Sequence, residues 1–290
     1  MKANIGKHFF SKEDKFSDSQ ILRFSDSKKP LIMGILNLTP DSFYDGGSHH
    51  SISDILCHCE KMLTEGADII DIGAFSSRPG MEVISTEEEL SRLLPSLREI
   101  KKAFPNCKIS IDTFRKEVAE KAIDYGADII NDISGGTFDE EMLPFIGKNH
   151  IPYVMMHSGN SIESLHHETI DKDICKEVKS FFTRQIETLS DYGEQNIILD
   201  PGIGFNKSMD SNFQLLKNID EYRVNNLPIL IGISRKSMIY KTLNISPSEA
   251  LNGTTVLNTI ALINGANILR VHDVKEAVEI VSLIKKLQDV

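Results

Sequence analysis

The chain contains 290 residues, of which 40% are hydrophobic and 26% are charged, and its formal net charge is −10. This length fits one large α/β domain or two small ones. The acidic balance argues against a broad nucleic-acid surface, and no apolar run approaches the ~18 residues of a membrane-spanning helix. The 4 cysteines are too few and too scattered for a disulfide framework or a four-ligand zinc site. The start of the chain lacks the apolar core of a signal peptide, so we expect a cytoplasmic protein.

Two kinds of segment alternate along most of the chain. Residues 1–29 are polar and weakly periodic, and we expect an N-terminal extension that could hold a short hairpin. From residue 30 to residue 290 we expect a single domain. Apolar runs typical of buried strands lie at 31–36, 68–72, 108–111, 128–130, 151–156, 196–199, 227–231 and 267–271. Amphipathic segments typical of helices lie at 52–65, 86–104, 115–125, 139–149, 168–192, 211–220, 236–264 (broken near Pro247) and 273–288.

Eight strand–helix pairs without a hairpin signal after residue 29 indicate a wholly parallel sheet. At this length the closed (β/α)8 TIM barrel is the expected fold. An internal repeat supports this prediction, because Gly66–Asp71, Gly126–Asn131 and Gly265–Arg270 share one pattern. Each begins with a glycine suited to end a helix, continues through alanine and an apolar strand, and ends on a polar residue.

In a barrel of this kind the functional site lies at the C-terminal ends of the strands. Nearly every predicted strand has a polar or sulfur-containing residue there: Asn37, Asp71, Asp112, Asn131, Met155 with His157, Asp200, Ser234 to Lys236, and Arg270 with His272. Any one of them could be a helix cap or a loop anchor. Together they would converge on one concave mouth, which is the place for a ligand.

A flat heterocycle with ring N–H and amino donors suits this mixture of side chains. Two carboxylates and an amide can accept from such donors, a lysine can donate to a ring carbonyl or nitrogen, and two apolar side chains offer flat faces. These groups are Asp112, Asp200 and Asn131, then Lys236, then Met155 and Phe205.

Positive charge in an otherwise acidic chain indicates that the ligand also carries an anionic group. Arg78, Arg270 and His272 could bind a diphosphate, and Ser237, at the start of a predicted helix, could hold a carboxylate. Asn37 ends the first strand before a long polar loop, so its amide oxygen could hold a hydrated Mg²⁺ or could simply cap a helix or close a turn. The chain has no evident nucleophile and no phosphate-binding loop pattern.

Seven segments together identify a resemblance. They are M-G-I-L-N-L-T-P-D-S-F-Y-D-G-G (33–47), D-I-G-A-F-S-S-R-P-G (71–80), I-S-I-D-T (109–113), I-I-N-D-I (129–133), L-D-P-G-I-G-F-N-K (199–207), G-I-S-R-K-S-M-I (232–239) and L-R-V-H-D-V (269–274). In this order, over about 240 residues, they resemble the dihydropteroate synthase family, the pterin-binding barrel enzymes of folate biosynthesis.

The resemblance implies a transferase that joins 6-hydroxymethyl-7,8-dihydropterin diphosphate to p-aminobenzoate and releases diphosphate. It implies a homodimer, Mg²⁺ as cofactor with Asn37 as its ligand, and sulfonamides as competitive inhibitors. The implied catalytic residues are Asp112, Lys236, Arg270 and His272. The implied pterin contacts are Asp112, Asn131, Met155, Asp200, Phe205, Lys236 and Arg270. Diphosphate would meet Asn37, Arg78, Arg270 and His272, and p-aminobenzoate would meet Ser77, Arg78, Pro79, Lys236 and Ser237.

Three residues depart from the family pattern. Phe75 stands where the second loop commonly has an acidic residue, Ser77 replaces a threonine, and Arg115 replaces a lysine. Two other functions share a pterin pocket: a pterin-dependent methyltransferase and a non-catalytic pterin-binding module. A methyltransferase would have no use for the diphosphate contacts, and a binding module could lose Asn37, Arg270 or His272, all of which are present.

Overall fold

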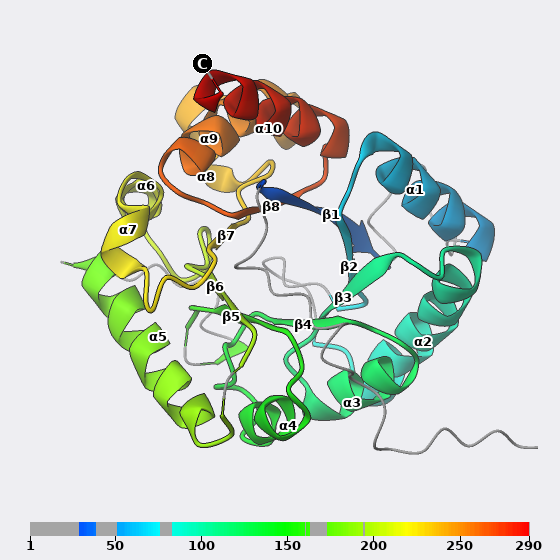
Figure 1. The fold of residues 1–290 in the computed structure, drawn as a ribbon. Coiled ribbons are helices and arrows are strands. Elements are labelled where there is room, and N and C mark those ends of the chain that lie inside the picture. The colour runs from blue at the N-terminus through cyan, green and yellow to red at the C-terminus, as the bar shows by residue number, and fades with distance from the viewer. Residues whose placement is uncertain are drawn as a thin grey trace, which may run out of the picture.

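The computed structural model describes residues 29–38, 51–75, 83–159, 161–162, 173–193 and 195–289. The predicted N-terminal extension therefore lies outside the described residues, apart from Lys29. We use the labels of Figure 1 for the helices and strands.

Eight parallel strands form the sheet, and their order is β6-β5-β4-β3-β2-β1-β8-β7. A parallel bridge between Leu199 and Ile229 joins β6 to the residues before β7, so the sheet closes on itself. The predicted (β/α)8 barrel is confirmed. The strands are β1 (Leu31–Asn37), β2 (Ile69–Gly73), β3 (Lys108–Asp112), β4 (Ile129–Asp132), β5 (Tyr153–Met156), β6 (Ile197–Asp200), β7 (Leu230–Ile231) and β8 (Ile268–Val271).

Helices surround the strands as an outer ring (Figure 1). The α-helices are α1 (Ile52–Glu65), α2 (Thr86–Ala103), α3 (Lys116–Asp124), α4 (Met142–Asn149), α5 (Ile174–Ser190), α6 (Met209–Lys217), α7 (Ile219–Tyr222), α8 (Ser237–Leu243), α9 (Leu251–Ile263) and α10 (Val274–Gln288). Two predicted helical segments are divided. The segment 211–220 is split at Asn218, whose non-helical backbone (φ −119°, ψ 46°) ends α6, and 236–264 is split, as predicted, by a short 3₁₀ turn at Pro247–Glu249.

The core has two layers because side chains alternate across each strand. One layer fills the barrel interior and consists of Met33, Ile69, Ile129, Val154, Ile198, Leu230 and Ile268. The other packs the outer face of the strands against the helices and includes Ile32, Ile70 and Leu199. Polar residues two or four positions beyond the inner layer, such as Asp71 and Asn131, therefore point into the same interior, nearer the C-terminal end.

The internal repeat is a structural device at the N-terminal end of the strands. Its glycines have φ angles of 103°, 96° and 99° at Gly66, Gly126 and Gly265, the left-handed conformation that glycine tolerates best. The side chains of Asp68, Asp128 and Asn267 accept hydrogen bonds from the backbone N–H groups of Ile32, Ile109 and Ile229, each at 2.9 Å. Each copy thus ends a helix and ties the following strand to its neighbour.

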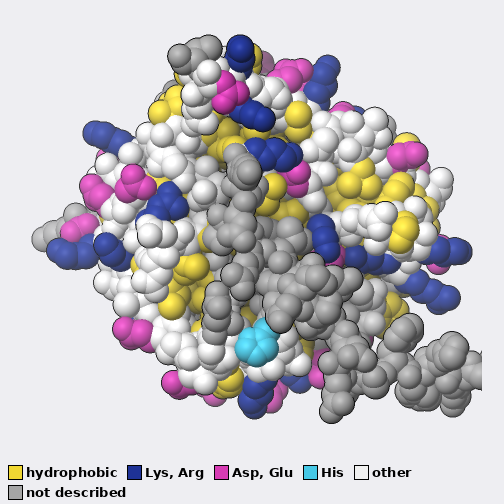
Figure 2. All heavy atoms as spheres, in the orientation of Figure 1, with side chains coloured by type: hydrophobic (Ala, Val, Ile, Leu, Met, Phe, Trp, Pro, Cys, Tyr) yellow, Lys and Arg dark blue, Asp and Glu magenta, His cyan; other side chains and the backbone are white. Residues whose placement is uncertain are grey.

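On the face seen in Figure 2, lysine and arginine side chains are interspersed with acidic ones around the rim. Among the described residues, no helix is both long and apolar enough to span a membrane.

Candidate active site at the mouth of the barrel

Arg270 is the centre of the polar network at the C-terminal ends of the strands. Its Nε donates to Asp71 Oδ2 at 2.7 Å, and its Nη2 donates to Asp112 Oδ2 at 2.7 Å. Asn131 Nδ2 donates to the same Asp71 oxygen at 3.1 Å. Residues from β2, β3, β4 and β8 thus meet inside one barrel, as the strand-end prediction requires.

Burial perturbs the acid–base properties of this network. Burial raises the pKa of Asp112 to about 7, although Arg270 opposes the rise; the negative charge of Asp71 adds to it. Burial by itself would lower the pKa of Arg270, but Asp71 and Asp112 outweigh it and raise that pKa above its ordinary value. Arg270 is therefore a permanent cation, whereas Asp112 titrates close to neutral pH.

Asp200 ends β6 and is held by a tight turn. Its Oδ1 accepts a hydrogen bond from Gly202 N at 2.7 Å, and burial raises its pKa against the opposing effect of Lys236. Gly202 has φ +68°, and a Cβ atom there would lie only 1.9 Å from the carbonyl oxygen of His157. Only glycine fits at this point, where the loops after β5 and β6 touch.

Lys207 fastens the same two loops. Its Nζ donates to the carbonyl oxygens of His157, Gly202 and Phe205 at 3.0 to 3.1 Å. The sequence prediction gave Lys207 no role, although it lies in the quoted segment 199–207. Its side chain is buried, which a lysine avoids unless it has partners such as these.

Lys236 extends from the residue before α8 toward the loop after β6. Its Nζ donates to the carbonyl oxygen of Ile203 and lies 4.5 Å from the centroid of the Phe205 ring. Burial lowers the pKa of Lys236 to about 8, although Asp200 opposes the fall. The ammonium group and the aromatic face that we predicted as ring contacts therefore lie side by side.

The loops after β7 and β8 are joined to each other. The ring Nδ1 of His272 lies 3.0 Å from Ser234 Oγ, which also accepts from the backbone N–H of His272 at 3.2 Å. Arg235 has φ +55° and forms a two-bond ion pair with Asp273 at 2.9 and 3.0 Å. This pair fixes the residue before Lys236 and the residue after His272. The side chain of His272 is exposed.

Met155 is the predicted site residue that the structure contradicts. It is 0% exposed and belongs to the outer core cluster between the strands and the helices. Met156, one residue later, packs with Phe114 and Ile133, with Phe205 against them. Because Val154 belongs to the inner layer, alternation along β5 turns Met156 inward and Met155 outward. Met156 is thus the methionine at the mouth.

Asn37 lies at the C-terminal end of β1 beside Asp112. A Cβ atom built on Gly73 would lie 3.6 Å from Asn37 Oδ1 and 3.7 Å from Asp112 Oδ2, so both oxygens face the same small space. Hard oxygen donors of this kind fit Mg²⁺, which commonly takes only one or two protein ligands and completes its shell with water and phosphate oxygens. Among the described residues, no group of three or more His, Cys, Asp or Glu side chains could hold a metal ion.

The predicted p-aminobenzoate contacts are only partly visible. Ser77, Arg78 and Pro79 lie outside the described residues. Ser237 is the first residue of α8, as predicted.

Asp71 is the residue of the mouth whose importance the sequence did not reveal. The sequence predicts that it ends a strand but predicts no function for it. Its side chain is 0% exposed, and its Oδ1 has no hydrogen-bond partner among the described residues. The available signal was a charged residue in the middle of β2, which is otherwise apolar apart from its last residue, Gly73. This signal does not identify the partner, because Arg270 is 199 residues away in the sequence.

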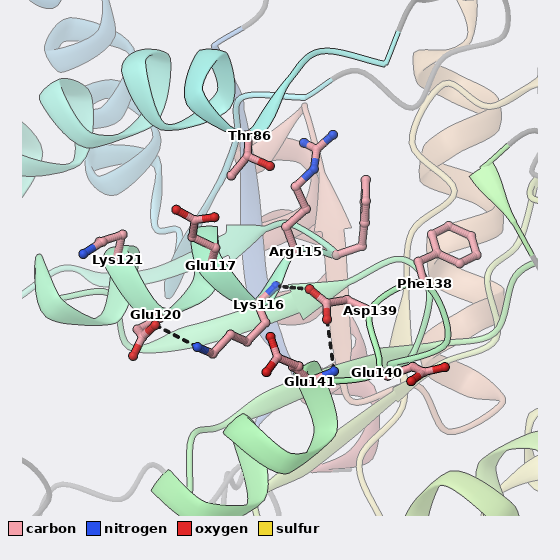
Figure 3. Close-up of a pocket in the computed structure, with 11 residues that line it drawn as sticks. Thr86, Arg115, Lys116, Glu117, Glu120, Lys121, Phe138, Asp139, Glu140 and Glu141 are labelled. Atoms are coloured by element: carbon pink, nitrogen blue, oxygen red, sulfur yellow. Dashed lines mark hydrogen bonds and ion pairs between the residues drawn. The ribbon is translucent and has the colours of Figure 1, made fainter.

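A cavity of about 740 Å³ lies beside this mouth and is distinct from it. Figure 3 shows it lined by the start of α2, the residues that begin α3 and the loop before α4. Acidic side chains outnumber basic ones in its lining, and Asp139 accepts from the backbone N–H of Lys116 at 2.7 Å. The cavity contains none of the strand-end residues described above.

Comparisons with known proteins agree with this geometry. Residues 33–272 match the family described as "Pterin binding enzyme". The chain is 40% identical over 262 residues to the dihydropteroate synthase of Escherichia coli (strain K12), covering 90% of this chain and 92% of that protein.

Two solved structures give the same result. The Yersinia pestis dihydropteroate synthase in complex with a sulfonamide drug has a TM-score of 0.84 at 37% identity, covering 90% of this chain and 95% of that chain. The Xanthomonas albilineans dihydropteroate synthase with 4-aminobenzoic acid has a TM-score of 0.83 at 33% identity, covering 91% and 94%. The chain therefore belongs to the pterin-binding enzyme family and, within it, to the dihydropteroate synthases.

Proposed function

We propose that the mouth of the barrel binds the pterin ring of 6-hydroxymethyl-7,8-dihydropterin diphosphate. Asp112, Asn131 and Asp200 accept from the donors of the ring, and Lys236 donates to its acceptors. Met156, Phe205 and the stem of Arg270 lie along its faces. The observation that carries this proposal is the convergence of these polar groups, from four different elements, around the half-buried guanidinium of Arg270.

The enzyme is a transferase of folate synthesis. It joins the pterin diphosphate to p-aminobenzoate and yields 7,8-dihydropteroate and diphosphate. The bond between the exocyclic carbon and the diphosphate oxygen breaks, a bond between that carbon and the amine nitrogen forms, and the amine loses a proton. Diphosphate can leave first, because the electron-rich pterin stabilises the positive charge that develops on the carbon.

We propose that the protein acts mainly through preorganised charge. Arg270 and His272, with Arg78, face the departing diphosphate. Asp112 and Asp200 stabilise the cationic pterin. The contacts between Arg270 and its two carboxylate partners fix the guanidinium before substrate arrives, so little reorganisation is needed during the reaction.

Asn37 is the proposed protein ligand of Mg²⁺. Its Oδ1 lies at the end of β1, next to the carboxylate of Asp112, where diphosphate oxygens and water would complete the shell. A bound Mg²⁺ would supply Lewis-acid stabilisation of the leaving group.

We propose that p-aminobenzoate lies against Ser77, Arg78, Pro79, Lys236 and Ser237. The 4-aminobenzoic acid bound to the Xanthomonas albilineans enzyme and the sulfonamide bound to the Yersinia pestis enzyme support p-aminobenzoate as substrate and sulfonamides as competitive inhibitors. The carboxylate would meet the hydroxyl and backbone N–H groups of Ser237.

An exposed apolar surface on α9 and α10 supports the proposed homodimer. Val256, Ile260 and Ile263 of α9 are 49%, 38% and 64% exposed, and Leu283 and Leu287 of α10 are 72% and 68% exposed. The two helices pack against each other, and exposed apolar side chains on neighbouring helices are of the kind that marks subunit contacts. The proposed compartment is the cytoplasm, in keeping with free thiols at all four cysteines.

Calorimetric titration of a pterin analogue tests the ring-binding proposal. Asp200→Ala leaves the donors of the bound ring without an acceptor, at a cost of about 1–3 kcal/mol, so affinity should fall by roughly tenfold or more. Glu187→Ala, at an exposed position on α5, serves as control and should bind normally. Unchanged affinity in Asp200→Ala would contradict the assignment.

A further inference from the structure

Two consecutive residues after β3 contact the chain on both sides of segment 76–82. The Phe114 ring packs edge-on against the ring of Phe75, with centroids 5.6 Å apart and planes at 84°. Arg115 Nη2 donates to the carbonyl oxygen of Ile84 at 2.6 Å. The last residues described before the segment and the first ones after it are therefore attached to the same dipeptide.

Arg115 is itself fixed by buried partners. Its Nη1 forms an ion pair with Glu89 of α2, a side chain only 1% exposed. Its guanidinium carbon lies 4.7 Å from the centroid of the Phe114 ring. A planar fork can hold a carboxylate and a carbonyl oxygen at once and stack on an aromatic face, which the single ammonium of a lysine cannot do. This set of contacts therefore requires an arginine at this position.

The dipeptide is also attached to the pterin pocket. Asp112, the partner of Arg270, precedes it by two residues, and the backbone N–H of Thr113 donates to the carbonyl oxygen of Asn131 at 3.0 Å. Figure 3 shows the Arg115 side chain directed from the start of α3 toward Thr86, at the beginning of α2. Arg115 thus spans the distance between the pocket wall and the chain that follows segment 76–82.

We propose that Arg115 is a positioning residue for the p-aminobenzoate half of the reaction. By holding Ile84 and, through Phe114, Phe75, it fixes the two points between which the sequence carries Ser77, Arg78 and Pro79. The strand end at Asp112 is held independently by the sheet and by Arg270. Loss of Arg115 therefore affects p-aminobenzoate and spares the pterin ring. This inference rests on the proposed function of Ser77, Arg78 and Pro79.

The test uses a variant that removes the ion pair without leaving a buried charge. In the double variant Glu89→Gln with Arg115→Gln, we expect the KM for p-aminobenzoate to rise at least about tenfold, the equivalent of one positioning interaction. The calorimetric affinity for a pterin analogue should stay within about twofold of wild type. Arg115→Lys keeps the positive charge opposite Glu89 but loses the planar guanidinium, so its KM for p-aminobenzoate should lie between the values of the wild type and the double variant.

Lys116→Ala is the matched control. It removes a neighbouring cation whose Nζ pairs with Glu120 on the surface. It should change neither the KM for p-aminobenzoate nor the affinity for the pterin analogue. An unchanged KM for p-aminobenzoate in the double variant would overturn the proposal. So would an equal loss of pterin affinity, which is the signature of a merely structural role.

Two further variants keep the result interpretable. If the double variant does not fold, Phe75→Leu removes the ring contact without unpairing a charge, and a normal KM for p-aminobenzoate there overturns the proposal. Arg78→Ala separates the inference from the function on which it rests. If Arg78→Ala raises that KM and the Arg115 variants do not, the inference is wrong; if Arg78→Ala has no effect either, the proposed p-aminobenzoate site is wrong.

Discussion

Replacing Asp71 with asparagine removes one negative charge from the centre of the mouth and almost nothing else. Asp71 Oδ2 accepts from Arg270 and from Asn131, whereas Oδ1 has no partner among the described residues. An asparagine can therefore keep its carbonyl oxygen toward both donors and place its amide nitrogen where Oδ1 has no hydrogen-bond partner among the described residues. The geometry is preserved, and the charge is lost.

The magnitude follows from the bonds that change. Hydrogen bonds to charged groups contribute about 1.5–3 kcal/mol and neutral ones about 0.5–1.5 kcal/mol. Weakening the Arg270 contacts in this way should lower the free energy of unfolding by about 1–3 kcal/mol. The charge of Asp71 also helps to hold the pKa of Asp112 near 7, so its removal should lower that pKa.

Two measurements on Asp71→Asn check these effects: urea unfolding and the pH dependence of pterin-analogue affinity. The ligand needs ionised Asp112, so on the acid side the affinity falls as the pH drops through the pKa of Asp112. In the variant this acid-side fall should move to lower pH. Asp68→Asn, at the opposite end of β2, is the control, since it can lower stability without moving the fall. If the fall stays in place or moves to higher pH in Asp71→Asn, the electrostatic reasoning is refuted.

Three further predictions concern the same site. Affinity for a pterin analogue should be bell-shaped in pH, because it needs ionised Asp112, with a pKa of about 7, and protonated Lys236, with a pKa of about 8; a flat calorimetric profile between pH 6 and 9 would contradict these roles. Chelation should abolish turnover and added Mg²⁺ should restore it, and full activity in excess chelator would exclude the proposed role of Asn37. Gly202→Ala should lower the free energy of unfolding by at least about 1–3 kcal/mol, from backbone strain alone; a variant as stable as wild type in urea would show that the turn is adaptable.

The fold could be predicted because its signals are local. Strands buried on both faces read as short apolar runs, and glycines such as Gly66 mark helix ends through a backbone property of the residue itself. The break at Asn218 was not predicted, since the amphipathic period continues across it and only the backbone of that residue interrupts the helix.

The site was harder to predict because its geometry depends on contacts between distant segments. The strand-end rule brought Asp112, Asn131, Asp200 and Arg270 together correctly. The run Y-V-M-M has apolar residues on both faces, so alternation cannot tell which methionine points inward; the register of β5 against β4 and β6 decides it. Likewise, no local pattern pairs Arg115 with Glu89, which lies on the preceding helix.

The two other functions considered from the sequence predict different products. A pterin-dependent methyltransferase would release no diphosphate, and a binding module would turn nothing over. The relatives described above are dihydropteroate synthases, and Arg270 is the proposed partner of the diphosphate.

Diphosphate release, measured with the purified protein, Mg²⁺ and 6-hydroxymethyl-7,8-dihydropterin diphosphate, tests the central claim most directly. With p-aminobenzoate present, diphosphate and 7,8-dihydropteroate should accumulate in equal amounts. Without p-aminobenzoate, no dihydropteroate can form, and sustained release should be far slower. Release that is absent in both conditions, or that proceeds at the same rate without any dihydropteroate formed, would contradict the account.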